Sequence, residues 1–201
     1  TKDNVVFTSV AADGKQVGEV QVRGQTLFSG YWNNSEGTIA SFTPDGEWFR
    51  TGDLAVLHGP HDFITIVDRV KDMIVVGGEN VYTTEVENVL YSHPDVEEAA
   101  VFGIPDVLLG ETVCAAVVLA KEQQIKLQGK QGESELASQL IKERLFTFSK
   151  LHLATYKVPT LFKFVPSLPK TSSGKIQRRL LRDKELSKIK LDTDICSVSA
   201  K

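Results

Sequence analysis

The stretch DRVKDMIVVGGENVYTTEVE, Asp68–Glu87, separates two parts of the sequence that differ in texture. It closes a series of short β-type segments, and its KDMIVV run predicts a strand that stops at Gly77-Gly78. TTEVENVLYSH then predicts a helix, with Thr84 and Glu87 as a possible capping box. We therefore expect a domain boundary close to Asp68–Lys71.

On the N-terminal side of this stretch, residues 1–70 predict β-structure. VGEVQVRG, LFSGYW, EWFR and DFITIVDR are short segments, and turn-forming sequences such as ADGK, PDG and HGPHD separate them. Short strands at this spacing are typical of a small barrel or a curled sheet.

On the C-terminal side, residues 71–190 predict a mixed domain, so the predicted fold class is α+β: a small β-barrel-like subdomain followed by a small α+β domain. EEAAVFGIP, ETVCAAVVLA and KVPTLFKFVP predict strands, and the polar stretch KEQQIKLQGKQGES predicts an exposed loop. Leu136, Leu140 and Leu145 at helical spacing predict a helix from about Ser134 to Leu153. IQRRLLRDKELSKI predicts a last helix, and residues 191–201 predict a disordered tail.

Composition and charge exclude several classes of protein. A net charge of -3 with 24% charged residues is not that of a nucleic-acid-binding basic protein. Cys114 and Cys196 lie far apart and predict neither a disulfide framework nor a metal site, which fits the cytoplasm or another reducing compartment. No apolar run approaches the ~20 residues of a transmembrane helix, no signal peptide is seen, and Ser199–Lys201 is not the S-K-L signal.

The segment PKTSSGKIQRR, Pro169–Arg179, places Lys175 behind a flexible polar run. A nucleotide-binding P-loop would need glycine in place of Pro169 and a hydroxyl residue in place of Ile176 to hold Mg²⁺. Lys175 is therefore not a P-loop lysine, although its setting suggests a phosphate. Taken alone, a lysine near a helix start is more often solvated than catalytic.

Two further segments are equally ambiguous when each is taken alone. Thr51-Gly52-Asp53 is either a turn or a carboxylate at a strand end that accepts hydrogen bonds from ribose hydroxyls. Arg69 and Asp72 can form a plain surface ion pair, usually worth ~0–1 kcal/mol. Gly77-Gly78 is either a hairpin turn or a place where the backbone passes close to a ligand.

As an ordered set, RTGDL, DRVKDMIVVGGENVYTTEVE and PKTSSGKIQRR closely resemble the adenylate-forming enzyme superfamily, which contains acyl-CoA synthetases, peptide-synthetase adenylation domains and beetle luciferases. The resemblance covers nearly all of residues 17–183. It implies that 1–70 are the β-subdomain that ends an incomplete N-terminal AMP-binding domain, and that 71–190 are the mobile C-terminal domain. The upstream phosphate loop, the acyl pocket and the expected Mg²⁺ ligands would lie in a missing N-terminal part.

The resemblance also implies a role for particular residues. The family's ribose-binding carboxylate and arginine fall on Asp53 and Arg69, and its hinge residue falls on Lys71. Its adenylation lysine, which approaches the ATP α-phosphate and the substrate carboxylate, falls on Lys175.

The implied CoA-binding residues are Gly77, Gly78 and Glu79, which match the loop that lines the pantetheine tunnel. Lys157 is a weaker candidate for a contact with a CoA phosphate, and a solvated lysine before a strand is the likelier alternative for it. No metal ligand is predicted.

The sequence departs from the family pattern at two places. Asp68 stands where most members have glycine, which affects the turn before Arg69. The helix around Leu145–His152 is about seven residues longer than usual, roughly two helical turns.

The resemblance implies the C-terminal part of a carboxylic acid–CoA ligase, which would use ATP, an acid and CoA and would be inactive without its N-terminal domain. Two alternatives stay open. One is an adenylation domain that delivers to a carrier protein, and the other is a non-catalytic binding or regulatory module.

Overall fold

The computed structural model describes residues 9–59, 63–127 and 131–198. The chain divides into two compact units, Thr1–Lys71 and Asp72–Lys201. Among the helices in the described ranges, none is long and apolar enough to cross a membrane.

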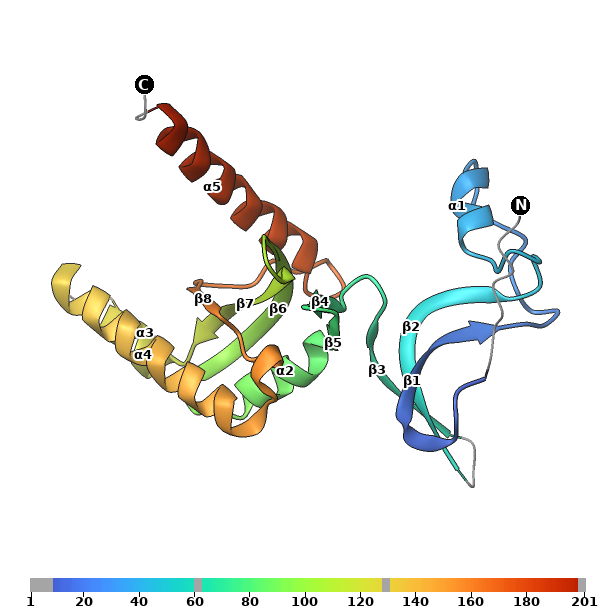
Figure 1. The fold of residues 1–201 in the computed structure, drawn as a ribbon, viewed down its shortest axis with the longest axis horizontal. Coiled ribbons are helices and arrows are strands. Elements are labelled where there is room, and N and C mark those ends of the chain that lie inside the picture. The colour runs from blue at the N-terminus through green and yellow to red at the C-terminus, as the bar shows by residue number, and fades with distance from the viewer. Residues whose placement is uncertain (1–8, 60–62, 128–130, 199–201) are drawn as a thin grey trace. The chain divides into compact units, whose positions relative to one another are not determined.

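Unit 1 is built on an antiparallel sheet of three strands in the order β1-β2-β3 (Figure 1). The strands are β1 (Asp13–Val22), β2 (Phe49–His58) and β3 (Phe63–Arg69), and the short helix α1 (Ser35–Ala40) lies between β1 and β2 in the chain. Asn34 caps α1 by accepting a hydrogen bond from the Gly37 amide at 2.8 Å. The described part of unit 1 is thus an open sheet and not a closed barrel.

The segment LFSGYW, predicted as a strand, is irregular in the structure. Its aromatic rings pack on each other and on β2: the Phe28 centroid lies 5.0 Å from that of Tyr31 and 5.2 Å from that of Phe49, both edge to face. Such ring contacts add to the burial of apolar surface. Phe28 and Tyr31 therefore belong to a local aromatic cluster instead of a sheet pairing, and Trp32 is exposed.

Unit 2 contains a five-stranded sheet built from β4 (Ile74–Val76), β5 (Glu79–Val81), β6 (Val96–Asp106), β7 (Gly110–Leu119) and β8 (Leu161–Phe164). The order is β5-β4-β7-β6, and β8 pairs in parallel with β7. The two long apolar runs predicted as strands are β6 and β7, which form one antiparallel hairpin.

Side chains of β7 alternate between two cores, as the period of a strand requires. Val113, Ala115, Val117 and Leu119 face one cluster, which also contains residues of α2 (Thr83–Tyr91) and α4 (Gln131–His152). Cys114, Ala116 and Val118 face the other cluster, with Leu181 of α5 (Arg178–Val198). Helices α4 and α5 therefore cover opposite faces of this sheet (Figure 1).

Three helix predictions need correction. The first residues of the polar stretch predicted as a loop form α3 (Lys121–Leu127), and residues 128–130 lie outside the described residues. The Gln123 side-chain amide donates to Asp95 Oδ1 at 2.7 Å, which holds this polar helix against the domain. In α4, Leu136 and Leu140 are exposed, and Ile141 and Leu145 carry the buried face. Helix α2 begins at Thr83 with Tyr82 as its cap, so the proposed Thr84 capping box is wrong.

The chain end also differs from the sequence prediction. Residues 191–198, predicted to be disordered, continue α5 in the structure, while 199–201 lie outside the described residues. The longer helix segment around Leu145–His152 is a continuous part of α4. The Phe148 ring in this segment packs edge to face on His93, with centroids 4.9 Å apart.

Candidate functional site

Asp53 and Arg69 face each other across two paired strands. They are direct partners in the register of β2 and β3, and Arg69 Nε donates to Asp53 Oδ1 at 2.8 Å. Thr51-Gly52-Asp53 is therefore inside a strand and is not a connecting turn. An irregularity follows at once, between Leu54 and Ala55, and Gly52 has φ +73°.

This pair is open to solvent, with 64% of the Arg69 side chain and 34% of the Asp53 side chain exposed. An exposed ion pair of this kind contributes only ~0–1 kcal/mol to stability. The pair has the groups to recognise a ligand, because a carboxylate can accept hydrogen bonds from vicinal hydroxyls and a guanidinium can donate them to ring or phosphate oxygens. The ribose contact expected at this pair stays a prediction.

Asp68, where most family members have glycine, shapes the end of β3. Its side chain is buried, and its Oδ1 accepts from the Arg69 amide at 2.8 Å. Val70 then donates its amide to the Gly52 carbonyl at 2.8 Å. These bonds hold the backbone of Arg69 beside the Asp53 strand.

Lys71 is the last residue of unit 1, and unit 2 begins at Asp72. Both residues lie in a turn between β3 and β4, and Lys71 is exposed. The role of Lys71 as a hinge stays a prediction.

Gly77 and Gly78 form the two-residue turn of the β4–β5 hairpin, with φ values of +58° and +89°. Two successive positive φ values are typical of a tight hairpin turn, and glycine adopts them without a steric penalty. Gly77 also donates its amide to the Leu109 carbonyl at 2.8 Å. A Cβ atom at Gly78 would meet nothing within 4 Å, and Glu79 next to it is exposed. The turn is an open tip where another molecule can approach the backbone.

Lys157 lies in the short 3-10 helix η1 (Thr155–Lys157) and is bound to a carboxylate. Its Nζ lies 2.8 Å and 2.7 Å from the two oxygens of Glu85, and its side chain is only 17% exposed. It is thus not the plain solvated lysine of the alternative reading, and a CoA phosphate would have to compete with Glu85 for it.

Lys175 lies in an ordered loop between β8 and α5. Lys170 and Ile176 form an isolated β-bridge, and Thr171 donates its amide to the Lys175 carbonyl at 2.8 Å. The Lys175 amide donates to Thr171 Oγ1 at 3.1 Å, and Gly174 has φ +83°. The backbone that carries the lysine is therefore closed by its own hydrogen bonds.

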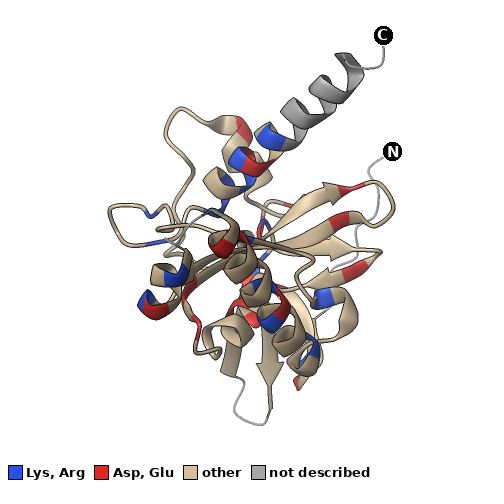
Figure 2. Cartoon of the chain, turned by 90° about the vertical axis from the view of Figure 1, so that its left-hand side faces the viewer, with Lys and Arg blue, Asp and Glu red and all other residues tan. Residues whose placement is uncertain are grey.

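The side chain of Lys175 contrasts with its neighbours. Acidic and basic residues are interspersed along the helices in Figure 2. Several cations of unit 2 have a carboxylate partner, among them Lys163 and Arg182. Lys170, five residues before Lys175, lies 2.7 Å from Glu98. Lys175 is exposed, and its ammonium makes no ion pair with any residue that the structure describes. The Lys175 side chain is therefore open to solvent on a loop that its own backbone hydrogen bonds close.

Two acidic residues of α2, Glu85 and Glu87, organise this region, and their cationic partners were not predicted from the sequence. Glu85 binds Lys157, and Glu87 accepts from the Val101 amide at 2.8 Å and binds Arg178. Glu87 follows directly on Val86 of the apolar stripe of α2 and is itself buried. A carboxylate beside a buried stripe needs a cationic partner, and that signal was available in the sequence.

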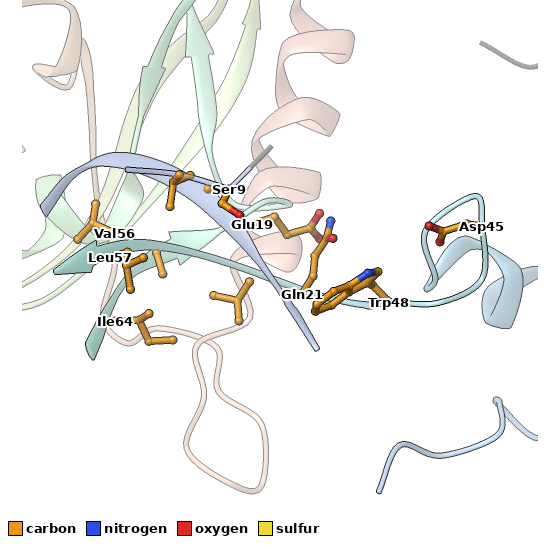
Figure 3. Close-up of a pocket in the computed structure, with 12 residues that line it drawn as sticks. Ser9, Glu19, Gln21, Asp45, Trp48, Val56, Leu57 and Ile64 are labelled. Atoms are coloured by element: carbon orange, nitrogen blue, oxygen red, sulfur yellow. The ribbon is translucent and has the colours of Figure 1, made fainter. Parts of the chain in front are cut away.

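A groove of about 640 Å³ lies on unit 1, lined by residues of β1, β2 and β3 and by Trp48 (Figure 3). None of the predicted site residues lines it: Asp53 and Arg69 are absent from its walls. We therefore do not assign the groove to the nucleotide site. No cluster of metal-ligating side chains occurs among the residues that the structure describes.

Comparison with known proteins shows which domain the chain carries. Residues 85–175 match the model of the AMP-binding enzyme C-terminal domain. The chain carries that domain. Among curated relatives, the 2-methylpropanoate–CoA ligase CCL4 of Humulus lupulus is 44% identical over 90% of this chain and 30% of the ligase. The chain spans about 30% of the length of the curated relatives it matches.

Solved structures give the same picture. The o-succinylbenzoate CoA synthetase MenE of Bacillus subtilis, in complex with its acyl-adenylate intermediate, matches 85% of this chain and 31% of its own, with a TM-score of 0.66 and 35% identity. The amide bond synthetase McbA of Marinactinospora thermotolerans matches 85% of this chain and 32% of its own, with a TM-score of 0.67 and 37% identity. The fold is therefore that of the C-terminal part of adenylate-forming enzymes. One of these two relatives is named a CoA synthetase and the other an amide bond synthetase.

Proposed function

We propose that the chain is the C-terminal part of an acid–CoA ligase and works with an N-terminal AMP-binding domain. In the first half-reaction a substrate carboxylate attacks the α-phosphorus of ATP, forming acyl-AMP and releasing pyrophosphate. In the second, the CoA sulfur attacks the acyl carbonyl, AMP leaves, and the thiol proton is lost to solvent or base. Mg²⁺ accompanying ATP would be bound outside the described residues of this chain.

The observation that carries this proposal is Lys175, an exposed cation on a loop closed by its own hydrogen bonds. Attack of a carboxylate on a phosphate joins two anions, so negative charge accumulates in the transition state. A positioned ammonium stabilises that charge as a point charge. Asp53 and Arg69 would bind the ribose, and Lys71 would allow the C-terminal domain to rotate between the two half-reactions.

The Gly77-Gly78 turn supports CoA as the acceptor. Its open tip would border the pantetheine path, with Glu79 beside it, and Lys157 is a second proposed CoA contact once Glu85 releases it. The likeness to an amide bond synthetase keeps another acceptor, an amine or a carrier-protein thiol, as an outcome of the experiments below.

The test is Lys175→Ala in the enzyme assembled with its N-terminal domain. We expect ATP–pyrophosphate exchange to fall at least ~100-fold, the low end for loss of a preorganised transition-state charge. Conversion of supplied acyl-adenylate to acyl-CoA should stay nearly intact, because Lys175 would then have moved away from the site. Lys170→Ala is the matched control, since it removes a lysine of the same loop that already has a partner.

Three results would contradict the proposal or a part of it. If Lys175→Ala matches Lys170→Ala in both assays, Lys175 is a solvated lysine, and a non-catalytic module becomes the better reading. If both half-reactions fall together at an unchanged thermal midpoint, the lysine serves both steps and domain alternation is wrong. If ATP–pyrophosphate exchange falls as expected in Lys175→Ala but the wild-type enzyme forms no thioester from CoA, the acceptor is another molecule.

A further inference from the structure

Arg178 begins helix α5 three residues after Lys175, and its guanidinium contacts two carboxylates that are distant in sequence. Nε and Nη2 lie 3.0 Å and 2.8 Å from the two oxygens of Glu87, a bidentate arrangement. Nη1 lies 3.4 Å from Asp72 Oδ2. One side chain therefore joins the start of α5, helix α2 and the first residue of unit 2.

This network is anchored in the domain and is unlike a surface ion pair. Only 9% of the Glu87 side chain and 23% of the Arg178 side chain is exposed. Glu87 also accepts the Val101 amide of β6 at 2.8 Å, so its carboxylate is held by a core strand. The planar fork of arginine suits two carboxylates at once, which a lysine ammonium cannot reproduce with the same geometry.

The ends that the network joins are both functional in the ligase proposed above. Gln177, next to Arg178, donates its amide to the Pro169 carbonyl at 2.8 Å and closes the base of the Lys175 loop. Asp72 directly follows Lys71, the proposed hinge. A rotation about Lys71 would therefore be transmitted to the Lys175 loop through the contact between Asp72 and Arg178.

We propose that Arg178 is a positioning residue for the adenylation step, acting through Lys175. It fixes the base of the Lys175 loop to α2 and to the segment just after the hinge, so that the ammonium arrives at a defined place when the domain swings. This inference rests on the proposed function. A misplacement of about 1 Å can cost on the order of 100-fold in rate, so a loosened loop base should be visible in kcat.

The test is Arg178→Lys in the enzyme with its N-terminal domain. We expect the kcat of pyrophosphate exchange to fall about 10- to 100-fold with little change in the KM for ATP. Thioester formation from supplied acyl-adenylate should stay within about twofold, since Lys175 takes no part in it. Asp72→Asn, a milder change at the other end of the network, should give the same pattern with a smaller loss.

The matched control is Arg179→Lys, at the adjacent residue, whose side chain is 92% exposed. It should leave both half-reactions unchanged. Amide hydrogen exchange gives a readout independent of activity: Arg178→Lys should speed exchange at Gly174, Lys175 and Gln177, whose amides are hydrogen-bonded within the loop, and leave Val113–Val118 protected.

Several outcomes would overturn the inference. Equal losses in both half-reactions that follow a lowered thermal midpoint mean that Arg178 only stabilises the fold. An Arg178→Lys variant indistinguishable from Arg179→Lys removes the positioning role. Lys175→Ala, run in parallel, separates the two proposals: if it leaves exchange of pyrophosphate unaffected, the ligase proposal fails, and the amide-exchange result alone then decides whether Arg178 holds the loop.

Discussion

At the scale of the residue, the structure shows which cations near the proposed site are bound to carboxylates. Lys157 and Lys170 each bind a carboxylate, and Arg178 binds two, whereas Lys175 has no carboxylate partner among the described residues. In the sequence, charge and spacing do not tell which of these four cations is neutralised. The difference comes from where the acidic partners lie after folding.

Cys114 gives a residue-scale prediction about pH. Burial, reinforced by the charge of Glu185, raises the pKa of the Cys114 thiol from an ordinary 9.0 to about 12. Between these values the unfolded chain loses a proton that the folded chain keeps, so this group's contribution to stability is complete below pH 9 and is lost as the pH rises toward 12. We expect the free energy of unfolding to fall in this window by up to about 1.4 kcal/mol per pH unit.

The measurement is urea unfolding at several pH values, for the wild type and for Cys114→Ala. Other groups titrate in the same range, so only the difference between the two proteins is informative. That difference should be constant below pH 9 and should shrink above it. A difference that stays constant to pH 11 would show that the thiol ionises in the folded state as readily as in the unfolded chain.

At the scale of the element, the β4–β5 hairpin carries the proposed contact with CoA at its turn. Its turn consists of two glycines at positive φ, and a side chain at Gly78 would point into open space. A substitution there has two separable effects, backbone strain from the positive φ and bulk on the outside of the turn. The two effects can be measured with different variants.

Gly78→Leu should therefore be compared with Gly78→Ala. Both put a Cβ at positive φ and should cost a similar ~1–2 kcal/mol of stability. Only leucine adds bulk at the proposed pantetheine path, so only Gly78→Leu should cripple thioester formation, and adenylation should survive in both. Equal thioester rates in the two variants would remove Gly78 from the path of CoA.

At the scale of the whole molecule, the chain changes unit between Lys71 and Asp72, in an exposed turn. The two half-reactions of the proposed ligase need different groups at one site. An alternation between two arrangements can supply both, provided that one residue between the units changes its backbone dihedrals.

Lys71→Pro should separate the half-reactions, because proline holds φ near -65° and so permits only one arrangement. We expect one half-reaction to survive, adenylation being the expected one. Lys71→Ala is the control: it removes the same charge and leaves the backbone free, so both half-reactions should persist. Turnover that Lys71→Pro leaves unchanged would place the hinge elsewhere.

The sequence by itself determined the α+β class, the strands β6 and β7, helix α4 and the family, because these depend on apolar periodicity and on ordered motifs along the chain. It could not show that β2 runs through Thr51-Gly52-Asp53 and pairs Asp53 with Arg69, since strand register depends on partners distant in sequence. It also misread Glu87 as part of a helix cap, because a local pattern was available to explain it.

Only the tertiary structure decided which charges are paired. The carboxylates that bind Lys157 and Arg178 lie 72 and 91 residues away in sequence, and both belong to α2. A buried carboxylate must find a cation, but the sequence does not say which one. The packing of the folded chain determines which cation pairs with each carboxylate, and the Lys175 side chain remains exposed.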